Sequence, residues 1–129
     1  MSYYFAKTID ASFAETVEKV KEALKAEGFG VLTEIDVKET LKKKLDVNFR
    51  NYRILGACNP PFAFKALKAE RMIGTMLPCN VIVQDGENGG TEVAAIDPIA
   101  SMQAVKNPGL GEVALTVQQK LKKVIEGLS

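Results

Sequence analysis

The first third of the chain alternates between patterns typical of strands and of helices. Residues 3–9 are aromatic and β-branched, which predicts a first strand. Ser12 and Glu15 have capping-box spacing, and apolar residues recur behind them at helical intervals, at Phe13, Val17, Val20 and Leu24. Gly28 suits the left-handed position that ends a helix. Residues 29–37 then predict a second strand, with one face formed by Phe29, Val31, Thr33 and Ile35.

The middle of the chain predicts a helix, a strand and a second helix. Residues 38–45 favour a short helix that carries three consecutive lysines, which we interpret as a solvated face. Residues 51–57 predict a third strand. Asn59-Pro60 then starts a helix that runs to about Arg71, with Asn59 as its cap and proline in its first turn.

The last third predicts a hairpin and a long helix. Residues 81–83 and 91–96 favour strands joined by the glycine-rich turn 85–90, and Asp97-Pro98 ends the second of them. After residues 107–109 the apolar positions follow one helical stripe, which comprises Leu110, Val113, Ala114, Val117, Leu121, Val124, Ile125 and Leu128. The element order predicts an α+β fold, with a mainly antiparallel sheet of about five strands and the C-terminal helix packed on it.

Composition narrows the class of protein. The 129 residues are 47% hydrophobic, which fits one domain over residues 1–129 with a core of its own. A net charge of +1 gives no strong field for nucleic acid or for a membrane surface. No apolar run approaches the roughly 20 residues that cross a bilayer, and the first seven residues lack the layout of a signal peptide. We therefore expect a cytoplasmic protein with reduced thiols.

The two cysteines of the chain are each followed by an asparagine, in Cys58-Asn59 and Cys79-Asn80. The chain has no histidine, which excludes a Cys-His nucleophilic pair and mixed Cys/His zinc sites. Two thiols alone do not complete a tetrahedral zinc site, and no glycine-rich phosphate loop is present. The sequence thus assigns no metal ligands and no particular cofactor, and carboxylates or a second chain would have to add ligands to the two thiols for a metal to bind.

Cys58 has two interpretations. A helix that begins at Asn59 would place this thiol at its N-terminal end, where the helix dipole and unpaired N–H groups favour a thiolate. Alternatively, the residue is a small buried apolar group, which is also the plainer interpretation of Cys79. Asn59 and Asn80 fit capping and backbone hydrogen bonding, or the lining of a pocket. Asp97 fits a turn, or a carboxylate beside the two Cys-Asn segments.

Three segments together resemble the family of domain of unknown function 302: residues 54–60, residues 76–83 and Ile96-Asp97-Pro98. The resemblance covers nearly the whole chain. It implies a curved antiparallel sheet around helices, similar to TATA-binding-protein-like folds, and no established activity. It carries over no catalytic residue, only the motif positions Cys58, Asn59, Pro60, Pro78, Cys79, Asn80, Asp97 and Pro98.

Three functional hypotheses follow. The first is a binding module for a small ligand or soft metal, with candidate site residues Cys58, Asn59, Cys79, Asn80 and Asp97 brought together in space. The second is a thiol-based enzyme or redox protein that uses Cys58, against which the absence of histidine as a general base counts. The third is an interaction domain that forms a homodimer through an exposed strand edge or helix face.

Overall fold

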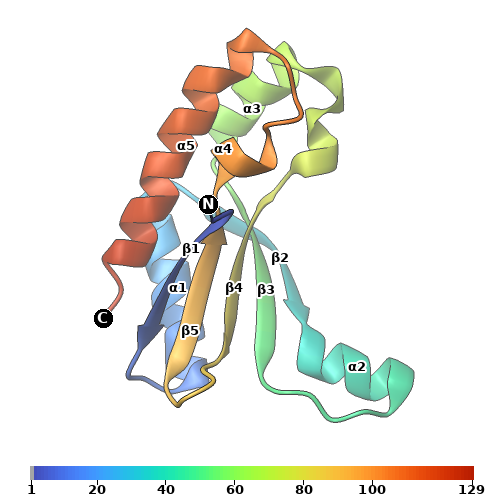
Figure 1. The fold of residues 1–129 in the computed structure, drawn as a ribbon, viewed down its shortest axis with the longest axis vertical. Coiled ribbons are helices and arrows are strands. Elements are labelled where there is room, and N and C mark those ends of the chain that lie inside the picture. Colours follow the sequence, from blue (N-terminus) through green and yellow to red (C-terminus); the bar gives the residue numbers. More distant parts are fainter. Residues whose placement is uncertain (1) are drawn as a thin grey trace.

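The computed structural model describes residues 2–129 and confirms an α+β fold built on one open, five-stranded antiparallel sheet (Figure 1). The strands in chain order are β1 (Tyr4–Ile9), β2 (Gly30–Asp36), β3 (Tyr52–Cys58), β4 (Cys79–Asp85) and β5 (Thr91–Ile96). Their spatial order is β1-β5-β4-β3-β2, and every neighbouring pair is antiparallel. The expected sheet of about five strands is therefore correct, with β1 and β2 at its edges.

Two long helices cover one face of this sheet. α1 (Phe13–Ala26) and α5 (Pro108–Glu126) contact the strands and each other. In Figure 1, α1 passes behind β1 and β5, and the near face of the strands is uncovered along most of its length. The core lies between the helices and the sheet, where the fully buried side chains include Val20, Leu24, Leu55, Val81, Val83, Val93 and Leu121.

The shorter helices lie at two separate places. α2 (Val37–Leu45) projects from the β2 side of the sheet and has no buried residue. α3 (Pro60–Ala69), the 3₁₀ helix η1 (Arg71–Met76) and α4 (Pro98–Ser101) gather beside the first half of α5, beyond the ends of the strands (Figure 1). The sequence did not predict η1 or α4. These two elements enclose the space described below.

Local sequence signals account for the helix ends. The Ser12 hydroxyl accepts a hydrogen bond from the Glu15 backbone N–H at 3.2 Å, as capping-box spacing predicts. Gly28 has a φ of +85°, the left-handed conformation expected after the helix. Asn107 caps α5 by accepting from the Gly109 N–H at 2.9 Å. The predicted apolar stripe of α5 faces the interior, with Val113 partly buried and the other members buried.

β2 departs from the predicted alternation. A β-bulge falls between Val31 and Thr33, so that Val31 pairs with Ala57 on the helix-covered face whereas Thr33 pairs with Gly56 on the other face. The expectation that Phe29, Val31, Thr33 and Ile35 share one side of the strand is therefore wrong. The inserted residue, Leu32, is left unpaired and exposed.

Candidate functional site: an apolar cavity at the end of the sheet

A cavity of about 310 Å³ lies where β3 ends and β4 begins. α3, η1, α4 and the first half of α5 form its walls, and the apolar lining side chains include Phe62, Ala66, Leu77, Met102, Leu110 and Val117. In the part of the chain that the structure describes, no charged residue lines it, and the polar lining side chains are those of Cys58, Asn59 and Cys79. The lining therefore favours an apolar occupant.

The pairing of β3 with β4 brings the two cysteines to this cavity. Ala57 lies directly opposite Cys79, so the start of β4 is next to the end of β3. Cys58 follows Ala57 at the point where the chain leaves the sheet for α3, and both cysteines line the cavity. Both are free thiols: Cys79 is buried and Cys58 is half-buried.

Burial determines the protonation state of Cys79. Removal from water disfavours the thiolate and raises the pKa of Cys79 to about 11, and the nearby Cys58 contributes in the same direction. Cys79 is therefore a neutral thiol at pH 7. A neutral thiol packs as a small apolar group and is a poor nucleophile and a poor metal ligand.

Asn59 does not cap α3 as predicted. It occupies the capping position, but its side chain makes no capping hydrogen bond, and its Nδ2 instead donates to the backbone carbonyl of Glu27 at 3.2 Å. This hydrogen bond ties the start of α3 to the turn between α1 and β2. Pro60 and Pro61 also lack N–H groups, so α3 offers fewer N–H donors to an anion at Cys58 than a helix without prolines in its first turn.

Asp97 and Asn80 do not line the cavity that the two cysteines line. The Asp97 carboxylate accepts from the Ile99 N–H at 3.0 Å and from Gln118 Nε2 at 3.1 Å, which fixes α4 against α5. Its neighbour Pro98 lines the cavity, whereas Asp97 is not among the lining residues. Asn80 is exposed and lines a hollow on the helix-free face. The structure thus brings Cys58, Asn59 and Cys79 together and leaves Asn80 on the other face of the sheet, because side chains alternate along β4.

Two leucines line the rim of the cavity, and the sequence did not indicate either of them as a site residue. Leu32, the bulge residue of β2, is 68% exposed, and Leu67 of α3 is 46% exposed, yet both line the cavity. Bulges often re-aim a side chain next to a functional site. A period-two pattern does not reveal a bulge, so sequence alone gave no signal for Leu32. The exposed leucines mark an apolar entrance to the cavity.

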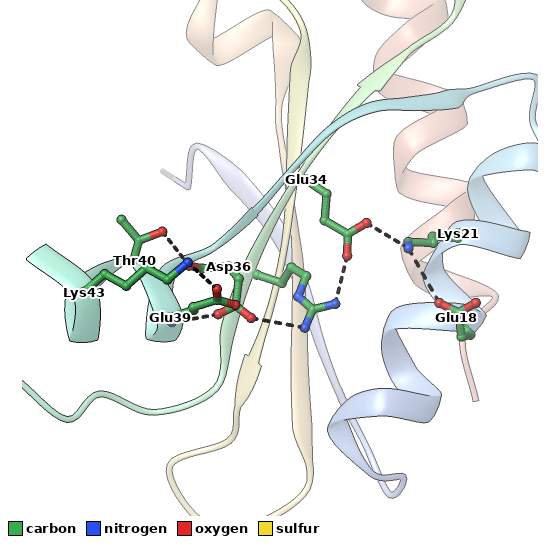
Figure 2. A network of polar contacts seen from close by, with 8 residues as sticks. Glu18, Lys21, Glu34, Asp36, Glu39, Thr40 and Lys43 are labelled. Carbon is green, nitrogen blue, oxygen red and sulfur yellow. Dashed lines mark hydrogen bonds and ion pairs between the residues drawn. The ribbon is translucent and has the colours of Figure 1, made fainter.

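A polar network holds the strand that carries Leu32. Glu34 Oε1 pairs with Lys21 of α1 at 2.8 Å, and its Oε2 accepts from Arg53 of β3 at 2.8 Å (Figure 2). Arg53 also reaches Asp36 at 3.5 Å. The hydrogen bond from Lys21 lowers the pKa of Glu34 and raises that of Lys21. The edge strand is thereby tied to both the helix layer and the adjacent strand.

Two further features concern the class of site. Within residues 2–129, no three side chains of His, Cys, Asp or Glu are grouped so that they could hold a metal ion. Over the same range, no helix combines the length and the apolar character needed to span a bilayer.

The fold and the cavity define an α+β domain with an open antiparallel sheet and an uncharged pocket at one end. The model of the family DUF302, a domain of unknown function, matches residues 5–128, and the chain belongs to this family. A similar solved structure is the crystal structure of an uncharacterized conserved DUF302 protein from Bacillus stearothermophilus, with a TM-score of 0.90 and 31% sequence identity over 98% of each chain. A comparison with curated proteins finds no match.

Proposed function

We propose that this DUF302 domain binds a small, mainly apolar molecule in the cavity between α3, η1 and α5. The observation that carries the proposal is an uncharged cavity of about 310 Å³ with two exposed leucines at its rim. Apolar side chains around a space gain contacts when an apolar group fills it. Water gains little there, because a bound water needs two to four polar partners.

The volume sets the size of the ligand. An engineered apolar cavity of about 150 Å³ accommodates benzene. The present cavity, at about 310 Å³, has room for a ring with a short chain or for a short acyl chain. It lies at the lower end of the range for small-molecule sites, roughly 300–1,000 Å³.

Asn59 supplies a polar group that would orient such a ligand. Its amide nitrogen is engaged with the Glu27 carbonyl, whereas its Oδ1 accepts no hydrogen bond from residues 2–129. A ligand hydroxyl or amine could donate to this oxygen. The proposed ligand is therefore an apolar molecule with one hydrogen-bond donor.

Thiol chemistry at Cys58 is a second candidate, favoured by the half-buried position of this residue in the same cavity. The state of Cys79 counts against a site that requires both thiols. A soft metal binds thiolates, and the raised pKa of Cys79 opposes the loss of its proton near neutral pH. The same effect disfavours a dithiol redox pair, so a role for Cys58 would be that of a single thiol beside the bound ligand.

Thermal unfolding with chosen ligands tests the proposal. Benzene, indole and hexanol differ in size and in the presence of a donor, and a ligand at 100 times its Kd stabilises a protein by about 2.7 kcal/mol. We expect indole and hexanol to raise the melting temperature, with Cd²⁺ as a comparison for the soft-metal alternative. If none of the three organic molecules changes the melting temperature at millimolar concentration, the proposed function is wrong.

A further inference from the structure

A row of apolar side chains crosses the helix-free face of the sheet from one edge to the other. Ile35 of β2 pairs with Ile54 of β3, and Ile54 pairs with Ile82 of β4. Ile82 pairs with Ala94 of β5, which pairs with Ala6 of β1. The five residues are directly opposite one another, one from each strand, and alternation along each strand directs them away from α1 and α5.

The side chains of this row are larger on the β2 side of the sheet than on the β1 side. Three isoleucines follow one another on the β2 side, whereas the β1 side has two alanines. Ala6, Ile82 and Ala94 help to line a hollow of about 400 Å³, which Tyr4 and Tyr52 also line. A ridge and a hollow therefore lie side by side on the same face.

The face carries little charge. Among residues 2–129, Glu92 is the one charged side chain that lines the hollow, and it accepts a hydrogen bond from Gln84 Nε2 at 2.9 Å. Gln84 in turn accepts from Arg50 Nε at 2.9 Å, so that Glu92 and Arg50 are linked through one amide. Because the face carries one group of each sign, the Glu92 of one copy could lie near the Arg50 of another, which would be a complementary contact.

The total surface of the chain is larger than a monomer of this mass requires. Its accessible area is 7908 Å² for 14.0 kDa. Monomeric proteins of this mass expose about 6,700 Å² by the usual scaling. The excess of about 1,200 Å² exceeds the area of about 800 Å² that each partner buries in a standard interface. The helix-free sheet face and the projecting α2, which has no buried residue, both contribute to this exposed area.

We propose that two copies of this chain form a twofold-symmetric dimer through the helix-free face of the sheet. A twofold contact places the same patch of each copy against itself. A twofold axis that lies between the two sheets and runs along the strands sets the isoleucine ridge of one copy, formed by Ile35, Ile54 and Ile82, over the alanine side of the other. The two sheets then pack face to face at about 10 Å. The proposal does not depend on the ligand cavity, which lies at the end of the sheet.

Sedimentation equilibrium at about 1–100 µM protein, a range that detects dimers with Kd values on the order of micromolar, tests the proposal with three variants. Ile82→Lys places a charge in the centre of the row. Ile35→Lys and Leu115→Lys introduce the same charge at side chains of nearly equal exposure, 47% and 46%, but Ile35 lies on the proposed interface and Leu115 lies on α5. Because both are exposed, neither substitution disturbs the core, and circular dichroism verifies that each variant is folded.

We expect the wild-type chain and Leu115→Lys to sediment with twice the mass of the chain. Ile82→Lys and Ile35→Lys should raise the dimer Kd about a hundredfold and about tenfold, because a twofold interface contains each lysine twice. If the wild-type chain is monomeric at about 100 µM, the proposal is wrong, and a partner of this face would be a different molecule. The proposal is also wrong if Leu115→Lys weakens the dimer as much as Ile35→Lys does. It is equally wrong if neither isoleucine variant weakens the dimer, because the contact then lies elsewhere.

Discussion

Thr33 of β2 stands directly opposite Gly56 of β3, and the Thr33 hydroxyl occupies the space in which a side chain on residue 56 would lie. A Cβ atom built on Gly56 would be 2.8 Å from the Pro78 ring. The close approach of three segments leaves no room for a methyl group. This packing fixes the register of β2 and β3 next to the cavity.

Gly56→Ala should therefore destabilise the fold. We expect the free energy of unfolding in urea to fall by about 1–3 kcal/mol, the usual cost of overpacking. Gly30→Ala is the matched control on the neighbouring strand, because a Cβ on Gly30 meets nothing within 4 Å. Its effect should stay within about 0.5 kcal/mol. Equal stability of the two variants would show that Thr33 and Pro78 do not confine residue 56.

The sequence predicts the strands and long helices well because their signals are local. Capping residues such as Ser12 and the apolar stripe of α5 act within a few turns of chain, and the structure confirms them. The bulge at Leu32 depends instead on how β2 pairs with β3, which no period-two pattern contains. The short elements η1 and α4 form where the chain closes over the cavity, and their residues have no strong periodicity.

The candidate site could be predicted only in part, because long-range contacts that no local pattern contains decide much of its geometry. The sequence singles out Cys58 and Cys79, and strand pairing brings both to the cavity. Asn59 has a long-range partner, the Glu27 carbonyl, that competes with the local capping role assigned from its position. Asn80 directly follows Cys79 but faces the opposite side of the sheet. The walls of the cavity come from α3, η1 and α5, which only the three-dimensional structure assembles.

Cys79 should resist alkylation in the folded protein at neutral pH. Burial raises its pKa to about 11, so the reactive thiolate is scarce below pH 9. In a Cys58→Ser variant, iodoacetamide should label Cys79 at pH 7.5 only after unfolding in urea, and labelling of the folded protein should rise steeply toward pH 11. Labelling of folded Cys58→Ser at pH 7.5 at the rate of free cysteine would contradict the assigned burial.

Glu34 should stabilise the fold in a pH-dependent way. Its pKa is lowered mainly by the hydrogen bond from Lys21, so its contribution is present above the ordinary glutamate pKa of about 4.3 and is lost as the pH falls through the lowered value. We expect Glu34→Gln to reduce the free energy of unfolding by less than about 1 kcal/mol at pH 7, because the pair is partly solvated.

The difference between wild type and Glu34→Gln should shrink when urea unfolding is repeated at pH 3. Glu18→Gln is the control, since Glu18 is largely exposed and lies 3.6 Å from the same Lys21 amine. It should have little effect at either pH. A loss of stability in Glu34→Gln that is as large at pH 3 as at pH 7 would mean that the carboxylate charge is not the cause.

The most direct test of the proposed function is a titration of the isotopically labelled protein with indole, monitored by the backbone amide signals in NMR spectra. We predict saturable shifts at Ala57, Ala66 and Val117, which line the cavity. Ala63→Phe adds a phenyl ring to the wall of the cavity and should abolish these shifts, whereas Lys68→Phe adds the same ring to an exposed position of α3 and should leave them intact. Shifts that persist unchanged in Ala63→Phe, or wild-type amides that do not respond to indole at millimolar concentration, would contradict binding in this cavity.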